Sequence, residues 1–194
     1  MSQKERMIKG LSYFPMDEEL VSNRQKCKTL CFEYNSLSPL ETDKKKEILD
    51  KIIKSHKDNF IIEPNFWCDY GYNIEIGENF YSNHNLILID CAKITFGDNV
   101  FIGPNCGFYT AQHPLDIENR NKGIEYAFEI KVGSNVWFGG GVNVMPNVTI
   151  GSNCVIAGGS VVTKDIEDNV IVGGNPAKVI RKITPEDKYK FEKP

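Results

Sequence analysis

The stretch VGSNVWFGGGVNVMPNVTIGSNCVIAGGSVV, residues 132–162, decides the fold of this chain, because one position in every six is apolar or aromatic. These six positions are Val132, Phe138, Val144, Ile150, Ile156 and Val162. In the strands of an antiparallel sandwich, apolar and polar residues alternate with a period of two, so apolar residues do not recur at every sixth position over 31 residues. A repeat of this kind indicates a solenoid built from stacked coils.

Two shorter runs upstream keep the same six-residue step. One contains Phe96, Ile102 and Phe108, and the other contains Ile76, Leu88 and Ile94, with Ser82 at the repeat position between Ile76 and Leu88. Glycine follows the apolar position at 77, 97, 103, 133, 139 and 151, and asparagine comes three residues after it at 79, 99, 105, 135, 147 and 153. Both residue types tolerate left-handed backbone, so each six-residue unit is expected to hold a short strand and a tight corner. Three units then make one coil of a parallel β-helix. Residues of a second register are expected to line the same faces: Val136, Val142, Val148, Cys154 and Ser160.

The chain therefore divides into a mainly β solenoid, residues 59–183, a helical region before it, residues 1–58, and a tail, residues 184–194, with a short C-terminal helix. Apolar residues recur at helical spacing from Asp17 to Asn35, with Asp17 as the N-cap. A second helix is predicted to begin at Ser38-Pro39, with Glu41 completing a capping box. Its buried stripe is Ile48, Leu49, Ile52 and Ile53.

Charge and composition exclude several classes of partner. The net charge is -3 and basic residues are dispersed among acids, so neither nucleic acid nor an anionic membrane is an expected partner. The first residues, MSQKERMIKGLSYF, contain no apolar signal region, which predicts a cytoplasmic protein. The six cysteines form no CxxC pair and are expected to be reduced core residues. The histidines are few and far apart, so no metal site is predicted.

The repeat lapses between Phe108 and Val132, and an extruded loop is predicted over residues 109–131. This segment is polar, contains proline and glycine, and carries His113, one of three histidines. Loops on a rigid scaffold are where functional residues concentrate, so the insertion is the first place to expect a site.

The six-residue repeat, the loop AQHPLD, the segment NVWFGGGVNVMPNVTIG and the ending SVVTKDI…GGNPAKVIRKI resemble the maltose, galactoside and nodulation-type sugar O-acetyltransferases. The resemblance covers nearly the whole chain, including CDYGYNIEIG and NFYSNHN. It implies a left-handed β-helix and transfer of an acetyl group from acetyl-CoA to a sugar hydroxyl. It also implies a homotrimer with active sites between neighbouring subunits.

Attack of a sugar hydroxyl on a thioester needs a base that titrates near neutral pH and later protonates the departing thiolate. The resemblance assigns this role to His113, whose alternative is an ordinary surface histidine. Fixed donors stabilise the oxyanion of the tetrahedral intermediate. Asn83 matches the family's residue for that role beside the bound thioester, and its alternative is a corner asparagine.

The resemblance also implies the acetyl-CoA site. Gly140 and Gly158 would line the pantetheine arm, Thr163 and Lys164 would meet its middle and phosphate portion, and Lys178 and Arg181 would face the nucleotide phosphates. Lys178 replaces an arginine of the galactoside branch, which keeps the charge and loses the bidentate fork.

On the acceptor side, Asp69 and Arg24 match positions of the family. Pro15 and Cys91 stand where galactoside enzymes carry aspartates, which favours a maltose or other glucosyl acceptor over a galactoside.

Two further acids have less defined roles. Asp90 is either a partial substitute for those missing aspartates or a solvated acid at a strand end. Glu125 either orients His113, contacts a partner subunit or is a solvated loop acid. The other readings of the whole chain are a xenobiotic or serine O-acetyltransferase, or a β-helix scaffold without catalysis.

Overall fold

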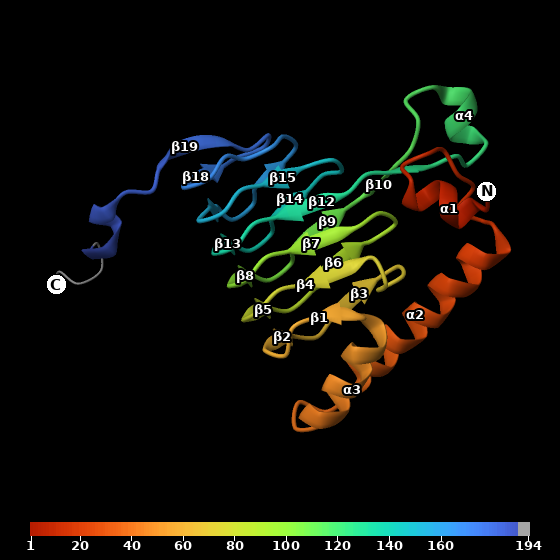
Figure 1. Cartoon of the computed structure of the whole chain (residues 1–194), viewed down its shortest axis with the longest axis horizontal. Coiled ribbons are helices and arrows are strands. Elements are labelled where there is room, and N and C mark those ends of the chain that lie inside the picture. The colour runs from red at the N-terminus through yellow and green to blue at the C-terminus, as the bar shows by residue number, and fades with distance from the viewer. Residues whose placement is uncertain (190–194) are drawn as a thin grey trace.

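The computed structural model describes residues 1–189, so the predicted tail is seen only in part and residues 190–194 lie outside the described residues. The described chain is a parallel β-solenoid with helices packed along its first coils (Figure 1). Lys131 pairs with Thr149, Trp137 with Val155 and Asn143 with Val161, a step of 18 residues in each case. The prediction that three six-residue units make one coil is therefore confirmed for the regular repeat.

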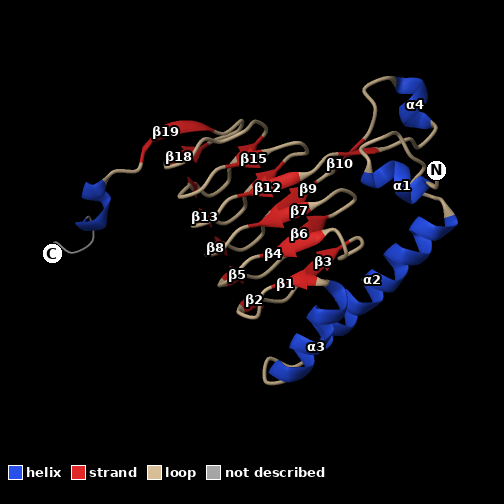
Figure 2. Cartoon of the chain, in the orientation of Figure 1, coloured by secondary structure: helices blue, strands red, loops and turns tan. Residues whose placement is uncertain are grey.

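The strands of the coils form three sheets along the faces of the solenoid, which we call the first, second and third sheets (Figure 2). The first sheet contains β1 (Ser55–His56), β4 (Ile74–Ile76), β7 (Ile94–Phe96), β12 (Ile130–Val132) and β15 (Thr149–Ile150). The second contains β2 (Phe60–Ile62), β5 (Phe80–Ser82), β8 (Val100–Ile102), β13 (Val136–Phe138), β16 (Val155–Ile156), β18 (Val170–Gly173) and the antiparallel β19 (Lys178–Lys182). The third contains β3 (Phe66–Cys68), β6 (Leu86–Ile89), β9 (Gly107–Tyr109), β14 (Asn143–Val144) and β17 (Val161–Val162).

The core of the solenoid consists of the repeated apolar positions stacked coil upon coil. All six positions of the regular run, and all five of the second register, are buried, as the period predicts. Four phenylalanines form a ladder through the coils: Phe80, Phe96, Phe108 and Phe138, with successive ring centroids 5.1, 5.1 and 5.2 Å apart. Aromatic contacts at these separations add to the burial of apolar surface that stabilises the stack.

Asparagine and glycine have different functions at the corners. The six predicted asparagines all have positive φ. Side-chain amides form ladders between coils at five of them, Asn79, Asn99, Asn105, Asn135 and Asn153, as where Asn79 donates to Asn99 over 2.8 Å. The glycines after the apolar positions do not have positive φ, so the prediction that they relieve left-handed backbone is wrong. Instead, a Cβ on Gly139 would lie 2.5 Å from the backbone nitrogen of Gly158. Glycine is needed there because successive coils approach too closely for a side chain.

The first predicted helix is confirmed as α2 (Glu18–Ser36), whose N-cap Asp17 accepts a hydrogen bond from the amide of Glu19 at 3.1 Å. The second, α3 (Thr42–Ile52), begins later than predicted. The carboxylate of Glu41 does accept from the amide of Ser38 at 2.9 Å, but this bond closes a turn before the helix. The predicted C-terminal helix is a 3₁₀ helix, η1 (Pro185–Tyr189).

Two short helices were not predicted: α1 (Gln3–Ile8), with a Ser2–Glu5 capping box, and α4 (Ile117–Asn121) inside the insertion. The insertion is also more ordered than a plain loop, because β10 (Ala111–Gln112) and β11 (Tyr126–Ala127) pair as an antiparallel hairpin. Helix α1 packs against β11, so the insertion rests on the N-terminal helices (Figure 1). Among residues 1–189, no helix combines the length and the apolar character needed to cross a bilayer.

Candidate active site

His113 follows directly after β10, where the hairpin leaves the solenoid, and its side chain is 52% exposed. Its Nδ1 lies 3.0 Å from the carbonyl oxygen of Ile124 on the opposite side of the hairpin. A carbonyl oxygen only accepts hydrogen bonds, so this contact assigns the proton of the neutral ring to Nδ1. The lone pair of Nε2 is then available to accept a proton.

Glu125 is held beside His113 by Tyr13. The carboxylate oxygen Oε1 of Glu125 lies 3.8 Å from Nε2 of His113, and Oε2 accepts a 2.6 Å hydrogen bond from the Tyr13 hydroxyl. The backbones of Tyr13 and Glu125 also exchange two 3.0 Å hydrogen bonds. Burial raises the pKa of Tyr13, so this phenol remains a donor. Glu125 is therefore not a freely solvated loop acid, since its side chain is only 19% exposed.

Arg24 on α2 and Asp69 directly after β3 lie on elements that pack against each other near the first coils. Arg24 donates from Nη1 to the hydroxyl of Tyr70 at 2.6 Å and from Nη2 to the carbonyl of Pro15 at 2.5 Å. Asp69 Oδ1 lies 3.6 Å from Nζ of Lys28, and the Asp69 side chain is 15% exposed. The two predicted acceptor residues thus sit on adjoining elements, with their side chains partly buried.

Asp90 is fully buried, so its interpretation as a solvated acid is wrong. Its Oδ1 accepts hydrogen bonds from the amides of Asp69 and Tyr70, at 2.9 and 2.8 Å, while Oδ2 has no partner within residues 1–189. Burial raises the pKa of this carboxyl group to about 7. Asp90 therefore supports the backbone of the Asp69 loop from inside. Next to it, the thiol of buried Cys91 lies 3.8 Å from Oδ2 of Asp69.

The predicted residues lie along two edges of the solenoid. The edge between the third and first sheets carries Asp69, Asp90, His113, Thr163 and Lys164, because it follows β3, β6, β9 and β17. The edge between the second and third sheets carries Asn83, Gly140 and Gly158, because it follows β5, β13 and β16. The width of the third sheet separates His113 from Asn83 within one chain.

On the second of these edges, Asn83 accepts from the amide of His84 at 2.7 Å through Oδ1. No hydrogen bond within residues 1–189 occupies its Nδ2, so two donor hydrogens remain available. Gly140 and Gly158 are exposed and stack on each other, since a Cβ on Gly158 would lie 3.1 Å from the carbonyl oxygen of Gly140. This edge therefore offers an amide donor and a strip of bare backbone.

Lys178 and Arg181, the two residues predicted to contact the nucleotide phosphates, lie on β19 and are exposed. Arg181 is already engaged, because both of its terminal nitrogens pair with the carboxylate of Asp187 at 2.7 and 2.6 Å. A phosphate would have to displace Asp187 to form a bidentate contact with this guanidinium. Lys178 lies at the start of the same strand.

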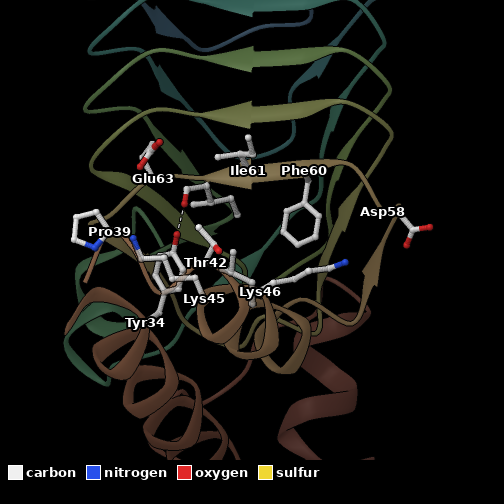
Figure 3. A pocket seen from close by; sticks show the side chains of 11 residues that line it. Tyr34, Pro39, Thr42, Lys45, Lys46, Asp58, Phe60, Ile61 and Glu63 are labelled. Atoms are coloured by element: carbon white, nitrogen blue, oxygen red, sulfur yellow. Dashed lines mark hydrogen bonds between the residues drawn. The ribbon is translucent and has the colours of Figure 1, made fainter. Parts of the chain in front are cut away.

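A groove of about 330 Å³ lies elsewhere, between α3 and β2. Figure 3 shows Lys45 and Lys46 on its helical side and Phe60 and Ile61 on its strand side, with the Tyr34 hydroxyl bonded to the carbonyl of Ile62. None of the predicted site residues lines it. The chemistry proposed below therefore does not depend on this groove.

Tyr13 and Tyr70 are the site residues that the sequence did not indicate. Tyr13 lies 112 positions from the carboxylate that it holds, and Tyr70 lies 46 positions from Arg24. An isolated tyrosine near an N-terminus has no motif that marks it. The aromatic and polar phrase CDYGYN was the one signal that included either residue.

Comparison with known proteins shows two family matches. Residues 6–57 match the maltose acetyltransferase hexapeptide capping motif, and residues 129–164 match the bacterial transferase hexapeptide in six repeats. The hexapeptide repeats imply that the solenoid is a left-handed β-helix, as the resemblance predicted. A Saccharomyces cerevisiae relative named only as an acetyltransferase is 56% identical over 171 residues, which are 88% of this chain and 87% of the relative.

Two solved structures are similar over nearly their whole length. A maltose O-acetyltransferase from Clostridium difficile 630 has a TM-score of 0.92 and 48% identity, covering 95% of this chain and 98% of its own. A galactoside acetyltransferase in complex with coenzyme A has a TM-score of 0.95 and 41% identity, covering 100% of this chain and 96% of its own. With the capping motif, the repeats and the common fold in agreement, the chain belongs to the maltose/galactoside O-acetyltransferase family of hexapeptide-repeat acyltransferases and is an acetyltransferase.

Proposed function

We propose that this protein transfers the acetyl group of acetyl-CoA to a hydroxyl of a maltose- or glucose-type sugar, with His113 as the general base. The observation that carries the proposal is the fixed imidazole: Nδ1 is bound to the Ile124 carbonyl and Nε2 faces the carboxylate of Glu125. A galactoside acetyltransferase of the same fold is seen with coenzyme A, which supports the choice of acetyl donor.

The reaction is a direct transfer. Nε2 of His113 takes the hydroxyl proton of the acceptor while the hydroxyl oxygen attacks the thioester carbon. The resulting tetrahedral intermediate collapses as its carbon–sulfur bond breaks. The imidazolium then returns the proton to the sulfur, so that CoA leaves as the thiol and His113 is neutral again. The negative charge of Glu125 stabilises the imidazolium between these two proton transfers.

The oxyanion donor in this proposal is Asn83 of a neighbouring subunit in a homotrimer. Within one chain Asn83 and His113 stand on different edges, so a cleft between protomers is a way to bring them together. The outward faces of the sheets support association, because the parallel strands of the second sheet expose three large apolar residues: Ile61, Phe101 and Trp137. Apolar area of this kind is stabilised by burial against another copy.

Acetyl-CoA would lie along the cleft. Gly140 and Gly158 present exposed backbone without side chains, which suits the thin pantetheine arm. Thr163 and Lys164 lie on the same edge as His113 and are exposed, so they would contact the middle of the cofactor. Lys178, and Arg181 after release from Asp187, would meet the nucleotide phosphates.

The acceptor would bind beside Asp69 and Arg24, whose side chains remain partly exposed. Asp90 contributes by holding the Asp69 and Tyr70 amides rather than by touching the sugar. Cys91 beside Asp69 supplies no carboxylate for the sugar hydroxyls, which favours a maltose or glucose acceptor over a galactoside.

The test is CoA-thiol release with glucose, maltose and a thiogalactoside as acceptors, for the wild type and for His113→Ala. We expect activity with the glucosyl acceptors and a loss of at least a hundredfold in the variant, in keeping with the usual contribution of a general base. His56→Ala is the matched control, since His56 pairs with Asp50 near α3 and has no proposed part in transfer. Undiminished turnover of His113→Ala would overturn the assignment.

A further inference from the structure

Three cysteines that lie far apart in the sequence converge where α2 packs against β3. Cys27 and Cys31 are four residues apart on α2 and so share one helical face, and Cys68 is the last residue of β3. The Sγ of Cys68 lies 3.4 Å from that of Cys27 and 3.8 Å from that of Cys31, and all three sulfurs lie within 4.8 Å of one another. All three residues are buried and all three thiols are free.

These separations match a metal-binding arrangement. A disulfide has its sulfurs about 2.05 Å apart, so the observed sulfurs are not bonded to each other. Tetrahedral zinc with Zn–S bonds of about 2.3 Å has sulfurs about 3.8 Å apart. From this geometry we propose that Cys27, Cys31 and Cys68 bind a zinc ion as three thiolate ligands.

A groove open to solvent reaches the cysteine cluster at Cys27. Its volume is about 210 Å³, and Cys27 is one of its lining residues. A water molecule would be the fourth ligand of the tetrahedral ion. Three lysines also line the groove: Lys26, Lys51 and Lys54. Three thiolates and Zn²⁺ carry a net negative charge, which these ammonium groups would partly offset.

The backbone around Cys68 is held in place by contacts of its carbonyl and of the next amide. The carbonyl of Cys68 lies 3.8 Å from the Cys27 sulfur, and the next amide, that of Asp69, donates to the buried carboxylate of Asp90 at 2.9 Å. Such outer contacts orient a ligand without binding the metal themselves. Bound zinc would fasten α2 to the solenoid, because its ligands come from both elements.

The absence of a metal motif in the sequence does not conflict with this proposal. Ligand spacing such as CxxC reveals sites whose ligands are close in sequence, whereas Cys68 lies 37 positions after Cys31. The site is separate from the proposed acetyl transfer, since none of its ligands is assigned to the catalytic, acceptor or CoA groups. The test therefore distinguishes the two proposals: zinc binding and acetyl transfer can each fail alone.

The test uses the full-length protein, freed of metal with a chelator under reducing conditions. Titration with Cd²⁺, followed by the ultraviolet thiolate-to-cadmium charge-transfer absorption, is expected to saturate at one ion per chain and to be reversed by Zn²⁺. The purified protein from zinc-supplemented cells is expected to contain one zinc per chain. Zinc is also expected to raise the unfolding temperature of the metal-free protein.

Cys31→Ala is expected to weaken Cd²⁺ binding at least a hundredfold and to abolish the zinc-dependent rise in unfolding temperature. Cys154→Ala is the matched control, because Cys154 is a buried cysteine of the solenoid away from α2 and should bind as the wild type does. Cys27→Ala, at the edge of the groove, provides a second variant if Cys31→Ala does not fold. The proposal is overturned if reduced wild type with six titratable thiols shows no charge-transfer band, or if the band persists in both ligand variants.

Discussion

Replacing Glu125 with glutamine removes the charge beside His113 while keeping the size of the side chain and an oxygen that accepts from Tyr13. The separation of 3.8 Å between Oε1 and Nε2 gives a Coulomb energy of about 1 kcal/mol in water and about 4 kcal/mol at the dielectric constant typical of a protein surface. Because His113 is 52% exposed and Glu125 is 19% exposed, solvent screening favours the lower part of this range, about 1–2 kcal/mol.

An energy of about 1–2 kcal/mol corresponds to a loss of about 5- to 30-fold in rate. The assay is thiol release at saturating acetyl-CoA, with kcat and KM for the acceptor measured across pH. We expect kcat to fall and KM to change little, since the charge acts on the imidazolium that forms during transfer.

Glu118→Gln is the control for this experiment. Glu118 belongs to the same insertion, pairs with Lys122 at 2.7 Å and does not contact His113. This variant should retain the kinetics of the wild type. If Glu125→Gln also retains kcat, then Glu125 has no electrostatic part in catalysis.

Tyr13→Phe removes the 2.6 Å hydrogen bond that the buried phenol donates to Glu125. We expect urea unfolding to show a loss of stability of about 1–3 kcal/mol, together with a fall in kcat. An unchanged kcat would show that Glu125 does not need this donor. Asp90→Asn tests the buried carboxyl group, whose pKa is raised from 3.8 to about 7 by burial, so that folding takes up a proton between these two pH values. The contribution of Asp90 to wild-type stability should be greatest at acidic pH and fall, on the order of 4 kcal/mol, as pH rises through about 4 to 7. The asparagine variant should lack this fall, and equal pH dependence of the two proteins in urea unfolding would contradict the assignment.

The sequence determined the fold because the repeat is a local property. An apolar residue at every sixth position leaves few ways to bury all of them, and a stacked coil is the one that the glycine and asparagine corners permit. The same regularity made the insertion around His113 visible as an interruption. The role of the corner glycines was predicted wrongly because a sequence shows which conformations a residue tolerates and not how closely the next coil approaches.

The tertiary structure decided which side chains meet. Glu125 became a partner of His113 and Tyr13, Asp90 became an internal support of the Asp69 loop, and Cys68 came to lie against Cys27. Each contact joins segments that are distant in the chain or that belong to different elements. Such contacts depend on how coils, helices and hairpin pack against one another, and no periodicity in the sequence encodes that packing.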